Sequence, residues 1–156
     1  MFGKILYIGE SEAHVENLIK DANSADLMNV NVIFEDSKGT ILGEVEELNE
    51  NIIKIRFLGE YVNGKYVNGV LRKPLLNSRI RMINKEELTE LVGTYSASSF
   101  ILGESAIYKG FNIHPSINSL FSNHLAIFGN SGSGKSCGVA RIVQNLFSSM
   151  FQVQYN

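Results

Sequence analysis

The chain has 156 residues, of which 44% are hydrophobic and 19% are charged, and its formal net charge is −2. This composition is ordinary for a folded globular protein and argues against disorder, while the low net charge excludes a global attraction to nucleic acid or anionic lipid. No apolar run reaches the roughly eighteen residues of a membrane span, and no signal-type block follows Met1, so we expect a cytoplasmic protein without a membrane partner.

The N-terminal part of the chain has the alternation of apolar and polar residues that is typical of half-buried strands. Strands are predicted at residues 5–8, 30–36, 41–45 and 53–57, with turns at 38–39 and 49–51. The stretch from His14 to Lys20 fits either a helical turn or a strand. The tetrapeptide YVNG occurs twice, at 61–64 and 66–69, and because Asn-Gly is a strong hairpin signal, a loop is predicted at each copy.

The next segment predicts one more strand and a short helix. Ile80 and Met82 alternate with two arginines, and Asn84 can cap a helix through Leu91, with Glu87 at the capping-box position. The small, polar stretch 93–99 then separates the β-rich part from the rest. We therefore predict a domain at residues 1–93, a small closed all-β barrel because closure removes exposed strand edges, and a second segment at 94–156.

One group of cations stands out in this first domain. It consists of Arg72, Lys73, Arg79, Arg81 and Lys85. The group can contact DNA or a protein partner, but a solvated barrel face is the simpler interpretation.

The clearest motif lies near the C-terminus. Residues 129–136 read GNSGSGKS and fit the complete pattern G-x-x-x-x-G-K-[ST], in which a glycine-rich turn wraps its N–H groups around a polyphosphate. Lys135 is expected to reach the β- and γ-phosphates and Ser136 to bind the bridging Mg²⁺, so both are predicted catalytic residues. The predicted nucleotide-binding residues are Gly129, Asn130, Ser131, Gly132, Ser133, Gly134, Lys135, Ser136 and Cys137.

The residues around the motif supply the strand–loop–helix context that it requires. The unbroken apolar run 125–128 predicts a strand buried on both faces. An apolar stripe at helical spacing follows the loop and consists of Val139, Ile142, Val143, Leu146, Phe147 and Met150. The loop therefore opens a helix whose positive dipole end faces the phosphates, which predicts an ATP- or GTP-type site. For Cys137, small-residue packing or an amide near the α-phosphate is favoured over redox chemistry.

The order of a small β-barrel, a connector and this motif resembles the HerA family of the FtsK/HerA ATPases. The residues that carry the resemblance are Asn118, Leu120, Phe121, Ser122, His124, Ile127 and 129–136, with Ser119 inserted between Asn118 and Leu120. The resemblance implies that residues 1–93 form a HAS barrel, in which His14–Lys20 is a strand. It also implies that residues 94–156 are a connector and the start of a RecA-like α/β ATPase domain.

The same resemblance implies a function. HerA-like proteins are homo-hexameric, ATP- and Mg²⁺-dependent translocases or helicases of double-stranded DNA. They act beside an effector, such as a nuclease or a sirtuin-like protein, in DNA-end processing or antiphage defence, and the effector is expected on the barrel. Since no acidic residue follows Glu104, the Walker B acid of such motors is missing. We therefore expect a truncated ATPase domain, inactive and poorly folded by itself.

Two other functions fit the motif less well. An assembly module would bind ATP to stabilise a ring around an effector without productive translocation. A small P-loop kinase or GTPase would need a compact lid or a guanine-reading N-K-x-D motif. The NKEE sequence at 84–87 lacks the aspartate and precedes the loop, which argues against a GTPase.

Overall fold

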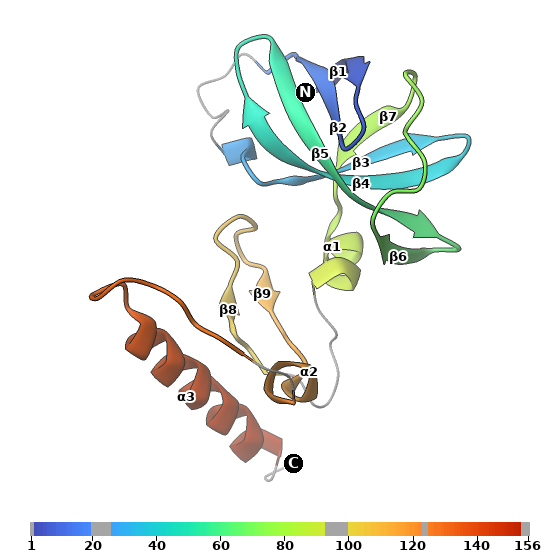
Figure 1. Cartoon of the computed structure of the whole chain (residues 1–156). Helices are drawn as coiled ribbons and strands as arrows, with labels where there is room; N and C mark the ends of the chain where they lie inside the picture. Colours follow the sequence, from blue (N-terminus) through green and yellow to red (C-terminus); the bar gives the residue numbers. More distant parts are fainter. Residues whose placement is uncertain (1, 20–25, 93–99, 123–124, 154–156) are drawn as a thin grey trace. The chain divides into compact units, whose positions relative to one another are not determined.

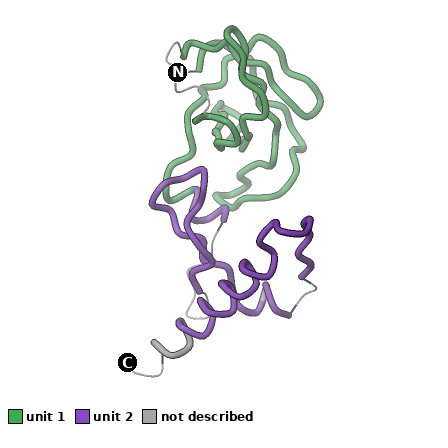
Figure 2. Tube along the Cα trace, turned by 90° about the vertical axis from the view of Figure 1, so that its left-hand side faces the viewer, with its two compact units in different colours: residues 1–87 green, residues 88–156 purple. Residues whose placement is uncertain are grey.

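The computed structural model describes residues 2–19, 26–92, 100–122 and 125–153. The chain divides into two compact units, unit 1 at residues 1–87 and unit 2 at residues 88–156 (Figure 2). Each unit is described by itself. The predicted boundary between residues 93 and 94 falls outside the described residues.

Unit 1 is a single curled antiparallel sheet (Figure 1). Its strands are β1 (Phe2–Ile8), β2 (Glu12–Asn17), β3 (Asn31–Asp36), β4 (Gly39–Leu48), β5 (Ile52–Val62), β6 (Lys65–Asn68) and β7 (Arg79–Met82). The order is β1-β2-β5-β4-β3-β7, and β6 pairs with the second half of β5. The strands predicted in this unit are confirmed. The segment from His14, for which a helical turn or a strand was open, begins within strand β2. Among the described residues β1 and β7 do not pair, so this is a half-barrel rather than the closed barrel that we expected.

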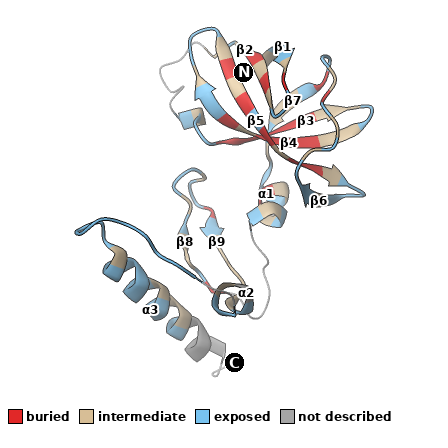
Figure 3. Ribbon diagram, in the orientation of Figure 1, coloured by how far each residue is buried: buried red, intermediate tan, exposed pale blue. Residues whose placement is uncertain are grey.

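The core of unit 1 lies inside the curl of the sheet (Figure 3). Its buried members alternate along the strands and are Ile5, Ala13, Val15, Val32, Phe34, Ile41, Val45, Ile53, Ile55 and Phe57. The rings of Phe34 and Phe57 meet edge to face, with centroids 5.7 Å apart. Burial of each large side chain stabilises the fold by roughly 1.5–3 kcal/mol, so this cluster is the main source of stability of unit 1.

Strand β3 departs from the predicted pattern. We expected one buried and one solvated face, yet Asn31 and Ile33 are buried as well as Val32 and Phe34. Ile33 pairs with Leu42 of β4, which is also fully buried. Both faces of the sheet are therefore covered here, and a strand covered on both faces need not alternate strictly.

Two glycines let the strands approach closely enough to curl. A Cβ at Gly43 would lie 2.6 Å from Cγ2 of Ile55 and 3.1 Å from the carbonyl oxygen of Arg56, and a Cβ at Gly59 would collide with the carbonyl oxygen of Val67. The β4–β5 register shifts beside Gly43. Bulges and glycines of this kind bend a sheet, which accounts for the curl.

The two YVNG copies have different structures. In the first, Asn63 (φ 54°) and Gly64 (φ 77°) form the two-residue turn between β5 and β6, the geometry that Asn-Gly favours. The second copy lies largely in β6 and ends at Gly69 (φ 87°). The prediction of a second loop was wrong because residues 65–68 pair with β5.

The predicted helix cap is confirmed in α1 (Lys85–Val92). The N–H of Glu87 donates to Oδ1 of Asn84 at 2.8 Å, and the N–H of Asn84 donates to Oε2 of Glu87 at 3.0 Å. This reciprocal pair is a capping box, so the local sequence fixes where α1 begins.

After α1, the described residues of unit 2 form a hairpin and two further helices. These elements are β8 (Gly103–Glu104), β9 (Asn112–Ile113), α2 (Ile117–Phe121) and α3 (Lys135–Val153). The hairpin and α2 were not predicted, because each is too short to show a periodic pattern. Phe100 and Phe111 are buried, and the rings of Phe100 and Phe121 lie 6.1 Å apart. In the part of the chain that the structure describes, no helix combines the length and the apolarity needed to span a membrane.

Candidate functional site

The glycine-rich loop 129–136 runs directly into α3. Gly132 (φ 79°) and Gly134 (φ 83°) have left-handed backbone conformations, and no atom lies within 4 Å of a Cβ built on either. Gly129 differs, because its Cβ would collide with Oγ of Ser133. Glycine is therefore required for backbone conformation at Gly132 and Gly134, whereas a Cβ at Gly129 would only displace the hydroxyl of Ser133.

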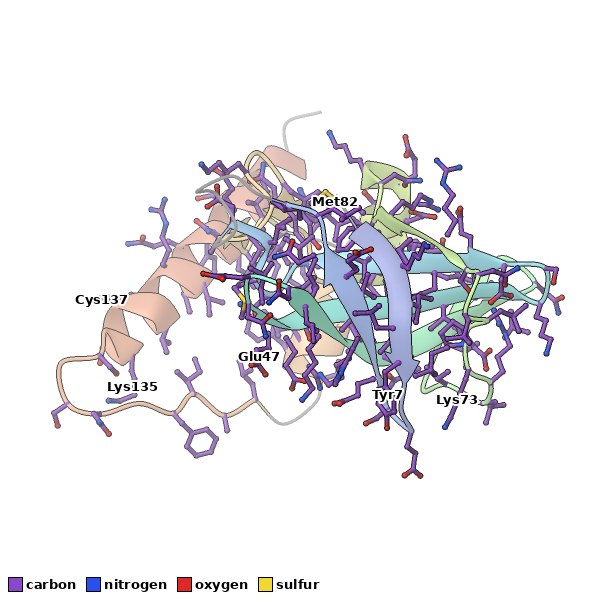
Figure 4. All side chains as sticks on the ribbon, turned by 90° about the horizontal axis from the view of Figure 1, so that it is seen from above. Tyr7, Glu47, Lys73, Met82, Lys135 and Cys137 are labelled. Carbon is purple, nitrogen blue, oxygen red and sulfur yellow. The ribbon has the colours of Figure 1, made fainter. Side chains whose placement is uncertain are left out.

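The side chain of Lys135 lies against this loop (Figure 4). Its Nζ donates a hydrogen bond of 2.6 Å to the carbonyl oxygen of Asn130, and the N–H of Ser133 donates to the same oxygen at 3.1 Å. The carbonyl of Asn130 thus organises the turn and holds the ammonium group over it. A phosphate in the loop would offer this ammonium group a charged acceptor in place of a carbonyl, and charge-assisted hydrogen bonds are the stronger kind.

The first turn of α3 provides the second part of the site. The N–H of Gly138 donates to the carbonyl oxygen of Gly134 at 2.8 Å, which is the first intrahelical bond. The N–H groups of Lys135, Ser136 and Cys137 precede this bond and therefore have no acceptor within the helix. Together with the helix dipole they favour an anion at the loop.

The side chains in this turn fit a nucleotide with Mg²⁺. Ser136 and Cys137 are exposed, and Cys137 is a free thiol at the start of α3 (Figure 4). Among the described residues no three His, Cys, Asp or Glu side chains gather into a metal site, so Ser136 would share a cation with phosphate oxygens and water. The loop brings all nine predicted residues, 129–137, together, and their role in binding stays a prediction.

The segment before the loop does not form the predicted strand. Residues 125–128 have no strand pairing, and Phe128 is 90% exposed. A parallel strand needs a hydrogen-bonded neighbour, and the two described strands of unit 2 pair with each other. His124, one of the residues that carries the family resemblance, lies outside the described residues.

The predicted helix after the loop is confirmed, but its apolar stripe is not covered. Val139, Val143 and Phe147 are exposed, whereas Ile142 and Leu146 are partly buried. Nδ2 of Asn145 donates to the carbonyl oxygen of Leu102 at 3.3 Å, which ties α3 to the chain just before β8. The predicted helical period of this stripe is therefore confirmed.

The basic cluster in unit 1 is not a uniform patch of free cations. Arg72 pairs with Asp36 at 3.2 Å, and Arg81 pairs with Glu35 at 2.7 Å and with Glu87 at 2.6 Å. The hydrogen bonds that Arg81 donates to Glu87, and the one that it donates to Glu35, raise the pKa of Arg81 despite its partial burial. These two arginines stabilise the fold, which favours the structural interpretation for them.

Asp36 is the centre of a network that the sequence did not indicate. Its side chain is 2% exposed and accepts hydrogen bonds from the N–H of Leu75 at 3.0 Å, the hydroxyl of Ser78 at 2.8 Å and the N–H of Lys38 at 2.8 Å. Burial alone would raise the pKa of Asp36, but these bonds and the charge of Arg72 outweigh it and lower the pKa to about 2. The loop between β6 and β7 is thereby fixed to the β3–β4 hairpin.

Comparison with known proteins gives one result for unit 2. Residues 100–153 match the family model described as "Helicase HerA, central domain". This part of the chain is similar to the central domain of HerA helicases, which agrees with the resemblance that the motif carried. A search of curated proteins found no match to the chain.

Proposed function

We propose, because residues 100–153 match the HerA central-domain model, that the protein is an ATP-driven translocase or helicase of double-stranded DNA. The observation that carries the proposal is the combination of this family with the loop 129–136. In that loop two left-handed glycines, a lysine and a free helix N-terminus converge. These are the groups that hold the phosphates of a nucleotide in P-loop ATPases.

The residues of the loop have separate roles in this function. Backbone N–H groups from Gly132 to Cys137 would bind the phosphates, and Lys135 would transfer its hydrogen bond from the carbonyl of Asn130 to the β/γ-phosphate oxygens. The hydroxyl of Ser136 would hold Mg²⁺. Bound ATP supplies the phosphoryl group whose transfer to water drives movement, and the loop positions it and neutralises its charge.

The assembly that we propose follows the family. Homo-hexamers would bind ATP between adjacent subunits and thread double-stranded DNA. The curled sheet of unit 1 would be the HAS-type barrel on which an effector, a nuclease or a sirtuin-like protein, docks. Its strand content and order support this part of the proposal. DNA-end processing or antiphage defence is the setting in which such a motor works.

The test is the substitution Lys135→Ala in the full-length protein, with Lys109→Ala as the control. Both lysines belong to unit 2, and Lys109 is exposed on the turn between β8 and β9. We expect Lys135→Ala to lower ATP turnover at least roughly a hundredfold, with and without duplex DNA, while the control keeps wild-type turnover. Undiminished turnover in Lys135→Ala would remove the site assignment.

A second candidate is the assembly module, which would use the same loop to bind ATP and so stabilise a ring without productive translocation. The module predicts ATP binding and ring formation without DNA-stimulated hydrolysis. Phosphate release measured with and without duplex DNA distinguishes the two functions.

A further inference from the structure

Positive charge is concentrated in one continuous part of unit 1. Residues 61–85 contain six cations and no Asp or Glu, although the whole chain has a net charge of −2. Two of these cations, Arg72 and Arg81, are bound by carboxylates and stabilise the fold. Lys65 and Lys73, by contrast, are exposed. The positive charge of this stretch is therefore only partly used within the fold.

The sheet brings a third lysine close to Lys65. Thr40 pairs with Tyr61, so the turn between β3 and β4, which carries the exposed Lys38, lies beside the end of β5. Val62 pairs with Lys65 across the next turn. The two hairpin turns therefore lie at the same end of the sheet, as Figure 1 shows.

Lys73 is fixed to this end of the sheet by its neighbour in the chain. Arg72 binds Asp36 at 3.2 Å, two residues before Lys38, and Lys73 extends outward from the same loop in Figure 4. We call Lys38, Lys65 and Lys73 the lysine patch. Neighbouring strands are about 4.8 Å apart, so side chains on turns two or three strands apart lie roughly 10–15 Å from one another.

The carboxylates at this end of the sheet are buried and already bound. The side chain of Asp36 is 2% exposed and that of Glu60 is 9% exposed, and both pair with Arg72. Residues 37–43 and 61–85 contain no other acidic residue, and among the described residues no carboxylate pairs with a lysine of the patch. A polyanion that approaches the turns therefore meets cations without exposed carboxylates between them.

The aromatic side chains at this end indicate which kind of polyanion fits. Tyr61 and Tyr66 are both partly buried, and their rings meet edge to face with centroids 5.9 Å apart. Proteins that bind single-stranded nucleic acid stack its bases on exposed aromatic rings, whereas the phosphates of a duplex need only cations and polar groups. The exposed amides of Asn63 and Asn77 lie on the same turns and can donate to phosphate oxygens. The surface is thus suited to a duplex backbone.

We propose that the lysine patch binds the phosphates of duplex DNA. The partner follows from three observations, namely the exposed lysines of three turns, the burial of the nearby carboxylates, and the match of residues 100–153 to a helicase model. The proposal rests on the proposed function and deepens it by naming a DNA contact in unit 1. The contact contributes affinity without sequence preference, because phosphates carry no sequence information directly.

The test measures duplex binding by the full-length protein in the absence of nucleotide. Fluorescence anisotropy follows a labelled duplex of about 20 base pairs at salt concentrations from about 50 to 200 mM. The patch variant carries Lys38→Gln, Lys65→Gln and Lys73→Gln. The control variant removes the same charge from exposed cations elsewhere and carries Lys4→Gln, Arg56→Gln and Lys109→Gln. Circular dichroism checks that both variants fold.

We expect the patch variant to bind the duplex at least roughly tenfold more weakly than the control variant. The slope of log affinity against log salt should become shallower by about 2–3, since each phosphate contact contributes about 0.9 to it. Equal affinities of the two variants would show that net charge alone decides binding and would overturn the proposal. Tighter binding of the corresponding single strand than of the duplex would also overturn it.

A competition experiment separates DNA from an acidic protein, which the exposed Leu71 on the same loop could also contact. Unlabelled duplex should displace the labelled duplex far better than polyglutamate of equal total charge. Equal displacement by polyglutamate would assign the patch to an acidic protein and overturn the proposal.

This proposal and the proposed function fail separately. ATP turnover of Lys135→Ala without DNA tests the nucleotide site, in which the lysine patch takes no part. Anisotropy without nucleotide tests the lysine patch, in which Lys135 takes no part.

Discussion

Asp36→Asn is expected to weaken unit 1 more than any other conservative substitution at a charged residue. The amide keeps the size of the side chain but removes the charge that faces Arg72 and weakens the acceptors for Leu75 and Ser78. Breaking one partner of a buried ion pair costs about 3–5 kcal/mol when both partners are fully buried. Since Arg72 is 23% exposed, we expect a loss of about 3 kcal/mol in the free energy of unfolding at pH 6.

The pH dependence gives a sharper test than the size of the loss. The pKa of Asp36 is lowered from 3.8 to about 2 in the folded state, so the folded state binds this proton less readily than the unfolded state. The charged carboxylate therefore contributes its full stabilisation above about pH 4, and the contribution is lost as the pH falls toward 2. Linkage gives about 2 kcal/mol for the part lost between pH 6 and pH 2.

Urea unfolding of wild type and Asp36→Asn, followed by far-ultraviolet circular dichroism at several pH values, measures this difference. We expect the gap between the two proteins to shrink by about 2 kcal/mol from pH 6 to pH 2, since only wild type has the group to titrate. Asp26→Asn is the control at an exposed carboxylate. A gap of constant size over this range would refute the assignment of the low pKa to Asp36.

Three further outcomes follow from the geometry. Gly43→Ala places a Cβ 2.6 Å from Ile55 and should lower the free energy of unfolding by about 1–3 kcal/mol in urea melts, while Gly103→Ala, which has open space, should not. Glu87→Gln keeps an acceptor for the capping box but loses the ion pair with Arg81, and it should cost about 1–2 kcal/mol with faster hydrogen exchange in α1. Gly134→Ala forces a side chain into a left-handed conformation (φ 83°) and should weaken ATP binding about tenfold in a fluorescence titration; unchanged affinity would contradict the phosphate-cradle geometry.

Features with local causes could be predicted from the sequence. The first Asn-Gly turn, the capping box at Asn84 and the helix after the loop depend on residues within one or two turns of each other, and all three are confirmed. The loop 129–136 was also found from its spacing alone, because its conformation depends on glycines and on the helix that it opens.

Features that depend on distant residues could not be predicted. In the sequence Asp36 is only the last residue of a predicted strand, and nothing nearby shows that it binds Ser78, 42 residues away. The second YVNG copy has the same letters as the first and becomes a strand because of its neighbour β5. The run 125–128 has the composition of a buried strand, but composition supplies no hydrogen-bonded neighbour, and none is formed among the described residues.

The strand order of unit 1 also constrains how the protein folds during synthesis. Val15 of β2 pairs with Ile53 of β5, and Val32 of β3 pairs with Met82 of β7. Such non-local pairs form only after long loops have closed. Closing a loop lowers the entropy of the chain before the new contacts stabilise it, and this slows folding. The sheet cannot be completed until residue 82 has left the ribosome. The N-terminal strands are therefore synthesised before the strands that they pair with. A pause in translation before residue 82 leaves their apolar residues exposed.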